Sequence, residues 1–306
     1  MSAAEPTAAA TADPTRAPAG VTTTGAAAVT VPTRRRPSAR LLRSELGLIS
    51  GRRRNQMGLL VLAAVPILLA VAVKVTSGPS AGRGPDFLSS VTANGLFVAF
   101  AALTLELPLF LPLAVAVLAG DAIAGEANLG TLRYLLTVPV SRARLLVVKL
   151  LSLAIGGFWG VLVVGLTGAV IGLALFGTGP LTTLSGSQIS FADACWRLLL
   201  VMLYLACCLT GLAAVGLFVS TLTEQPIAAT VAVTIFSTLS FILDSVPQLE
   251  WLHPYLLVHD WTAFADLLRD PPFWDTVRQG LLVDGAYVVV FGLLAWARFA
   301  GKDVTS

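Results

Sequence analysis

The sequence carries little charge for its length. Charged residues make up 12 % of its 306 residues, whereas soluble domains carry about 25 %. Hydrophobic residues make up 56 %, and the mean hydropathy is +0.83. A water-soluble fold of this length could not bury so much apolar surface. Lipid must therefore form part of the protein's solvent.

Residues that usually build catalytic or metal centres are also scarce. The three cysteines, Cys195, Cys207 and Cys208, lie in or beside apolar stretches without CxxC or histidine spacing. The only histidines are His253 and His259, and they form no H-E-x-x-H pair. The sequence has no G-x-x-x-x-G-K-[ST] loop, which would hold the phosphates of ATP. These absences predict that the chain is not itself an enzyme and binds no cofactor.

The amino-terminal part is predicted to precede the membrane domain. Residues 1–37 are rich in Ala, Thr and Pro and are expected to form a disordered cytoplasmic tail. Residues 38–56 are predicted to form an amphipathic helix on the membrane surface, with Arg43 and Glu45 off its apolar face. The apolar face consists of Leu41, Leu42, Leu46 and Ile49. The alternative is a solvated basic leader. No nucleic-acid partner is expected, because the arginines adjoin a membrane span.

Six apolar segments predict an all-α polytopic membrane protein, with a transmembrane domain at 57–306. They are 57–76, 94–119, 145–176, 198–220, 226–246 and 280–299. The third segment is too long for one perpendicular span and is expected to tilt or lie partly at the interface.

The distribution of Lys and Arg beside the spans predicts the orientation. It places both termini, the loop at 120–148 and the turn near Glu224 in the cytoplasm. The loop at 247–279 is then external. Because it is rich in Trp, Tyr and Phe, it is expected to form one or two short helices at the outer leaflet, with its aromatic side chains at the headgroup boundary.

The cytoplasmic stretch "GDAIAGEANLGTLRYLLTVPVSRARLLVVKLL" carries the most information about function. Residues 121–128 are predicted to form a short helix with Asp121 and Glu126 exposed. Gly130 then breaks that helix, and "TLRYLL" begins a second amphipathic turn that stops at Pro139. Ser141 is expected to cap the third span. Two short helices displayed below the membrane form a surface that another protein could bind.

This stretch resembles the signature of the type-2 ABC exporter permeases. The matching residues are Glu126, Gly130, Thr131, Leu132, Leu135, Leu136, Pro139, Val140, Ser141, Arg142 and Lys149. The segments "LLRSELGLISGRRRN" and "RFAGKDVTS" resemble the family's basic leader and its aromatic-basic-Asp tail. The resemblance runs from about residue 38 to the end.

The resemblance implies that a separate ABC ATPase subunit binds ATP and Mg, while this chain forms the substrate path. It also implies a second permease subunit, identical or related, and export across a bacterial cytoplasmic membrane. Substrates of the family range from drugs to lipids, and no motif here selects among them. The implied ATPase-coupling surface consists of Asp121, Glu126, Asn128, Gly130, Thr131, Leu132 and Arg133, with Glu224 as a second contact.

Glu106 lies near the middle of the second span, where a charged carboxylate is costly and should face protein or water. It is either a residue of the substrate path or of helix coupling, or an acid hydrogen-bonded between helices without a transport role. Pro108 and Pro112 are expected to kink the same helix. Two rival functions stay open. One is an ion- or proton-coupled secondary transporter that uses Glu106, and the other is a non-transporting scaffold that binds an ATPase.

Overall fold

The described chain folds almost entirely into helices, as its composition predicts. The computed structural model describes residues 38–76, 94–130, 141–179, 181–183 and 185–301. The predicted tail at 1–37 therefore lies outside the described residues. The α-helices are α1 (Ser38–Gly51), α2 (Arg53–Thr76), α4 (Leu96–Glu106), α5 (Phe110–Gly120), α6 (Glu126–Asn128), α8 (Arg142–Phe176), α9 (Phe191–Leu222), α10 (Pro226–Asp244) and α11 (Asp275–Ala300).

Six helices in the described part of the chain are long and apolar enough to cross a membrane. They are α2, the continuous helical stretch 110–128, α8, α9, α10 and α11, which confirms the predicted all-α polytopic fold. Helix α8 has 35 residues, or about 52 Å at 1.5 Å per residue. This exceeds a hydrocarbon core of about 30 Å, in line with the expected tilt or interfacial extension.

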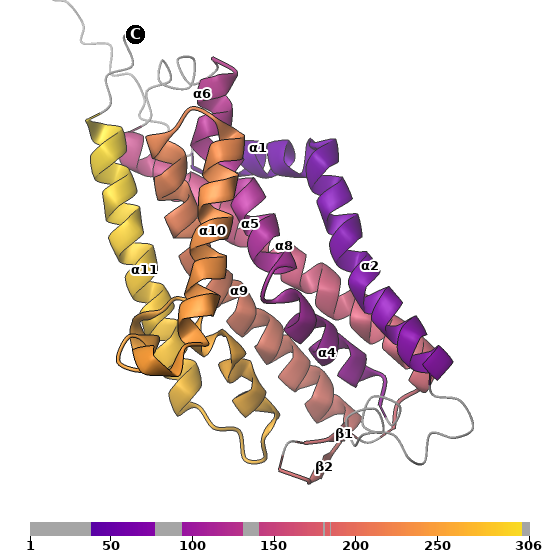
Figure 1. The fold of residues 1–306 in the computed structure, drawn as a ribbon. Helices are drawn as coiled ribbons and strands as arrows, with labels where there is room; N and C mark the ends of the chain where they lie inside the picture. The colour runs from indigo at the N-terminus through magenta and orange to yellow at the C-terminus, as the bar shows by residue number, and fades with distance from the viewer. Residues whose placement is uncertain (1–37, 77–93, 131–140, 180, 184, 302–306) are drawn as a thin grey trace, which may run out of the picture. The chain divides into compact units, whose positions relative to one another are not determined.

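The second predicted span is divided into two helices, and this is a larger departure than the expected kink. Helix α4 ends at Glu106 and α5 begins at Phe110, with turns between them. Pro108 has no N–H for an intrahelical hydrogen bond, and its ring clashes with the preceding turn. Leu109 leaves the helical region, with φ −137° and ψ −57°. The break gives α4 and α5 separate directions (Figure 1).

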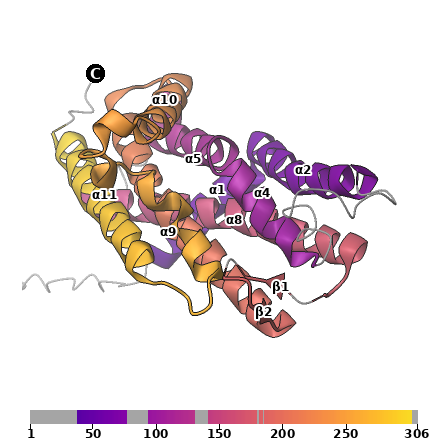
Figure 2. The same ribbon diagram turned by 60° about the horizontal axis from the view of Figure 1, so that its bottom comes forward.

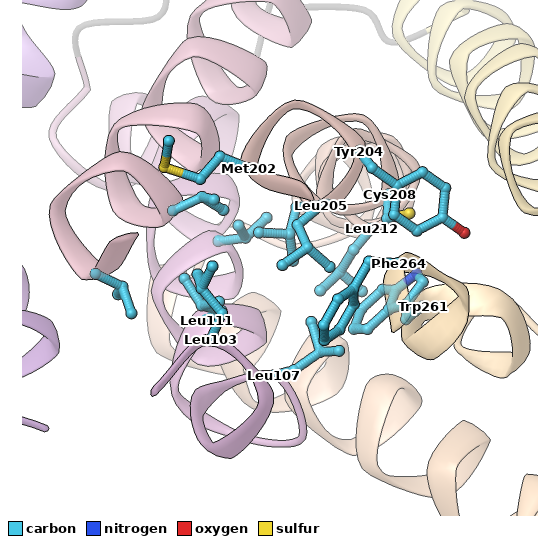
Figure 3. Close-up of a cluster of buried hydrophobic side chains, with 14 of the residues drawn as sticks. Leu103, Leu107, Leu111, Met202, Tyr204, Leu205, Cys208, Leu212, Trp261 and Phe264 are labelled. Atoms are coloured by element: carbon cyan, nitrogen blue, oxygen red, sulfur yellow. The ribbon is translucent and has the colours of Figure 1, made fainter. Parts of the chain in front are cut away.

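Helix α9 forms the centre of the helical core. It packs mainly against α11 and α8, and also against α5 and α10 (Figure 2). The buried side chains at this centre come from α4, α5, α9 and the loop after α10 (Figure 3). They include Leu103, Leu107, Leu111, Met202, Tyr204, Leu205, Cys208, Leu212, Trp261 and Phe264.

Helices α4 and α8 approach each other closely because small residues face each other between them. A Cβ atom on Gly168 would lie 2.7 Å from Cα and 3.2 Å from Cβ of Ala99. These distances are too short for non-bonded carbon atoms. Glycine at 168 therefore sets the separation of the two backbones.

The ends of the helices gather at two opposite ends of the bundle (Figure 1). The end that we call the α1 end holds α1, α6, the turn between α9 and α10, and the last residues of α11. The other, the hairpin end, holds the two-stranded sheet of β1 (Leu181–Thr182) and β2 (Gln188–Ile189). These strands are antiparallel, with Leu181 opposite Ile189.

The hairpin end also holds the segment between α10 and α11. It contains three 3₁₀ helices: η3 (Pro247–Leu249), η4 (His253–Tyr255) and η5 (His259–Leu268). Trp261 is fully buried and packs edge-on against Phe241 of α10, with ring centroids 5.6 Å apart. Phe264 is also buried. The expectation that all aromatic side chains of this loop lie at a headgroup boundary is therefore wrong for these two. Trp251, Tyr255, Phe273 and Trp274 are exposed.

Candidate functional site

The segment after α5 changes its helical winding where it leaves the bundle. Helix α5 ends at Gly120 and continues as the π-helix η2 (Asp121–Gly125), which α6 follows. A Cβ atom on Gly120 would lie 2.7 Å from the carbonyl oxygen of Pro226. Only glycine allows the first turn of α10 to come so close. The predicted helix at 121–128 is present, and its first half has the π-winding that is common at functional sites.

Ser220 of α9 fixes the backbone of η2. Its Oγ accepts hydrogen bonds from the N–H groups of Ile123 (3.1 Å) and Ala124 (2.9 Å). The same hydroxyl donates to the carbonyl oxygen of Gly120 (3.2 Å). All of these groups are buried, where unpaired polar groups are costly. Displacing η2 would therefore disturb α9.

Asp121 is held by two arginines, one between α1 and α2 and one in the first turn of α2. Its Oδ2 forms ion pairs with Arg52 and with Arg54. The Asp121 side chain is only 13 % exposed, so the expectation of an exposed carboxylate is wrong here. Asp121 therefore ties η2 to the amino-terminal helices.

Glu126 also points inward rather than outward, contrary to the prediction. It is 9 % exposed, and its Oε1 lies 2.6 Å from Nζ of Lys149 in α8. Lys149 is 1 % exposed and also donates to both carboxylate oxygens of Glu45 in α1, at 3.2 and 3.4 Å. The buried ammonium group thus joins α1, α6 and α8. Glu126 stays a proposed coupling residue, but through this ion pair and not as an exposed contact.

Helix α1 is present as predicted, but its inward face differs from the prediction. Glu45 is buried on the face that contacts α8, between Leu41 and Ile49 one turn away on either side. Leu48 is exposed. Residues 53–56, which the sequence predicts as the end of the amphipathic helix, belong to α2. The burial of Glu45 follows from its bond to Lys149.

A small hollow lies among these charged groups. Glu45, Arg52, Asp121, Glu126 and Lys149 line it. Apolar side chains, including Leu118 and Leu153, complete its wall. Residues 121–130, which we call the coupling segment after their proposed role, therefore pack against charged and apolar groups together.

The exposed part of the segment is its tip. Asn128 is exposed, and Leu129 is 68 % exposed. Gly130 has a φ of +66°, which confirms the predicted end of the helix. Thr131, Leu132 and Arg133 lie outside the described residues, as does the predicted turn that ends at Pro139.

Two other predictions concern the flanks of this tip. Ser141 caps α8 as predicted, because its hydroxyl accepts a hydrogen bond from the N–H of Arg144 at 3.4 Å. Glu224 lies exposed in the turn between α9 and α10, at the same end of the bundle. The structure thus places the predicted second contact on the side that carries the tip.

Glu106 lies apart from this segment, at the last residue of α4, where the second span is broken. Its side chain is fully buried. Neither carboxyl oxygen has a hydrogen-bond partner among the residues that the structure describes. The interpretation as an acid hydrogen-bonded between helices therefore finds no partner in this part of the chain.

Sequence reasoning missed Ser220, Arg52 and the inward direction of Glu45. Two signals were present in the sequence. Lys149 is a lysine within an apolar run, which predicts a buried partner. Glu45 is four residues from both Leu41 and Ile49, a spacing that places all three on one helical face. Nothing in the sequence marks Ser220 among the other serines of the spans.

Comparison with known proteins identifies the family. A family model described as "ABC-2 family transporter protein" matches residues 51–240, more than half of the 306 residues. The match runs from the end of α1 into α10 and includes η2, α6 and Lys149. No curated protein matches the chain. The chain is a multi-pass membrane protein that belongs to the ABC-2 transporter family.

Proposed function

We propose that this chain is the permease subunit of an ATP-driven exporter and that a separate ABC ATPase subunit binds ATP and Mg. Family membership and the six apolar helices support a membrane path. The printed sequence has no phosphate-binding loop for ATP. Hydrolysis therefore belongs to the partner, and ATP and Mg are bound there and not by this chain.

The α1 end faces the cytoplasm of a bacterial inner membrane in this proposal. Basic residues gather at that end, and they follow the positive-inside rule. Those described there are Arg40, Arg43, Arg52, Arg53, Arg54, Arg142, Arg144 and Arg298. The Asn128–Gly130 tip then lies where an intracellular ATPase can reach it.

The coupling mechanism rests on one observation, namely that the segment behind the exposed tip is bonded to several helices at once. Asp121 binds the start of α2 through Arg54, and Glu126 binds α8 through Lys149. Ser220 binds η2 to α9, and Gly120 contacts α10. A displacement of the tip by a moving ATPase would therefore be transmitted to four membrane helices. The proposed coupling residues keep this role, with Asp121 and Glu126 transmitting and Asn128 and Leu129 docking.

The ATPase partner provides the test. We would co-express the full chain with an ATPase encoded by an adjacent reading frame and isolate the complex. Leu129→Asp should abolish co-purification, because it places a charge on the exposed apolar tip. Trp251→Asp, a matched change of an exposed apolar side chain at the hairpin end, should leave the complex intact. Equal recovery of the ATPase with both variants would contradict the proposed docking site.

A second permease subunit, identical or related, is also proposed. Helices α10 and α11 bury little of their surface within the chain and expose apolar side chains such as Ile235, Leu282 and Val289. Lipid and a second permease chain are the occupants that suit this surface. Native mass spectrometry of the isolated complex would count the permease chains, and a single copy with two ATPase subunits would contradict the pairing.

Glu106 is proposed to lie on the substrate path. Its carboxyl group is buried without a hydrogen-bond partner among the described residues, next to the break between α4 and α5. The same observation favours the rival function, a proton-coupled carrier. Transport by reconstituted vesicles separates the two. An exporter requires ATP and tolerates a protonophore, whereas a proton-coupled carrier needs the gradient and no ATP.

A further inference from the structure

Three potential metal ligands meet at the hairpin end, in the segment that follows α10. Asp244, His253 and His259 each offer one ligand atom, and these atoms all lie within 4.8 Å of one another. Nδ1 of His259 lies 2.6 Å from Oδ1 of Asp244, and the two imidazole rings are 5.6 Å apart between centroids. All three residues are partly buried.

The fold brings these residues together from three separate elements. Asp244 is the last residue of α10, His253 begins η4, and His259 begins η5. The segment that contains η3 and η4 brings both imidazoles back to the end of α10. Nε2 of His253 lies 3.1 Å from the carbonyl oxygen of Val246. A ring nitrogen that donates to a carbonyl leaves the other nitrogen free to bind a metal, as is usual for histidine ligands.

We propose that Asp244, His253 and His259 bind a divalent transition-metal ion, with zinc as the best match. Imidazole and carboxylate donors suit zinc, and three protein ligands leave a fourth position for water. Zinc binds such donors at about 2.0–2.2 Å, which places tetrahedral ligand atoms about 3.4 Å apart. The ligand atoms of His259 and Asp244 lie 2.6 Å apart, and all three ligand atoms lie within 4.8 Å of one another. Metal binding would therefore require the side chains to move apart or together by about 1 Å.

The charge at the end of α10 also favours a cation. The last carbonyl groups of a helix carry partial negative charge, and a carboxylate at this position adds to it. Asp244 occupies this unfavourable position. A bound zinc ion would offset both charges. The competing metal-free arrangement is an ion pair between Asp244 and protonated His259.

Zinc at this site would fasten the loop to the membrane helices. The loop already anchors Trp261 in the core against Phe241, and Arg197 of α9 donates to the carbonyl oxygen of Leu267 at 3.2 Å. Both anchors lie along η5, whereas the metal would join η4 and η5 to α10. The zinc ion would therefore have a structural role, because it would hold the loop against α10 at the hairpin end.

The test uses the full chain, purified in detergent with an affinity tag that contains no histidine and stripped of metal with EDTA. After zinc is added and the protein is desalted, about one zinc ion per chain should remain. His253→Gln, His259→Gln and Asp244→Asn should each weaken zinc binding by about tenfold or more. Asp275→Asn is the matched control, because this exposed carboxylate lies elsewhere at the same end. Zinc should also raise the melting temperature of the parent protein but not of the three variants.

Ligand identity has an independent readout. Copper(II) bound at the site should show electron paramagnetic resonance coupling to two imidazole nitrogens in the parent protein and to one in His253→Gln. The number of coupled nitrogens reports the ligands themselves, whereas the melting temperature reports only stability. Zinc retention that persists in the triple variant, or the absence of nitrogen coupling, would overturn the proposal. No zinc retention by the parent protein would leave the ion pair between His259 and Asp244 as the correct account.

Discussion

Nζ of Lys149 lies 2.6 Å from Oε1 of Glu126, although the two residues belong to different helices. The same ammonium group donates to Glu45, so two carboxylates share one buried cation. A charge buried in a low-dielectric interior is tolerated when it is paired and hydrogen-bonded, and it is costly when its partner is removed. Lys149 of α8 therefore links its own helix to α1 and to the coupling segment.

Removing this cation should destabilise the protein strongly. Lys149→Met leaves Glu45 and Glu126 buried without their counter-ion, which costs about 3–5 kcal/mol in comparable cases. The melting temperature in detergent micelles should fall accordingly. The triple variant with Glu45→Gln and Glu126→Gln should recover much of the loss. Lys74→Met changes an exposed lysine and serves as the control, so an equal loss there would contradict the assignment.

Ser220→Ala should loosen the coupling segment without unfolding the bundle. The substitution removes the hydroxyl that accepts from the N–H groups of Ile123 and Ala124, at a cost of about 1–3 kcal/mol. Hydrogen–deuterium exchange at these two amides should become faster. Ser237→Ala is the matched control, because the buried Ser237 hydroxyl has no partner among the described residues. Unchanged exchange in Ser220→Ala would show that the hydroxyl does not hold η2.

Gly168→Ala should separate α4 from α8. The added methyl group would overlap the backbone of Ala99, and overpacking of this kind costs about 1–3 kcal/mol. The melting temperature should therefore fall. Gly285→Ala adds the same methyl group where nothing lies within 4 Å and should stabilise α11 by up to about 1 kcal/mol. Equal melting temperatures for the two variants would contradict the close approach.

Glu106→Gln should raise stability and lower export. An amide costs less to bury than a carboxylate without partners, so the melting temperature should rise. ATP-dependent export in reconstituted vesicles should fall, because the proposed substrate path would lose its acidic group. Binding of the ATPase should be unchanged, since Glu106 lies at the end of α4 and not in the exposed tip at Asn128–Gly130. Unchanged export with normal stimulation of the ATPase would remove Glu106 from the mechanism.

Much of the fold could be predicted from the sequence because hydropathy and helix-ending signals are local. The six apolar runs, the cap at Ser141 and the end at Gly130 all depend on residues close together in the chain. The burial of Trp261 was not predictable in this way. Its aromatic ring suits either a headgroup boundary or a core, and its contact with Phe241 decides between them.

The candidate site was predictable in its location but not in its electrostatics. Glu126 looked exposed because it lies in a short polar helix between two spans. Its burial depends on Lys149, 23 residues later, and on the return of α1 with Glu45, 104 residues before Lys149. Such long-range pairing follows from the packing of α1 on α8. A single sequence gives no measure of that packing.

The break at Leu107–Leu109 divides the second span between two sets of neighbours. Helix α4 packs mainly against α8 and α2, whereas α5 packs mainly against α10 and α9. Backbone groups freed by such a break need cover from protein or water within a bilayer. In the proposed coupling mechanism, a force that enters through Asp121 therefore reaches α5 before it reaches α4. We expect the two halves of this membrane crossing to tilt by different amounts when the segment moves, because no continuous helix joins them.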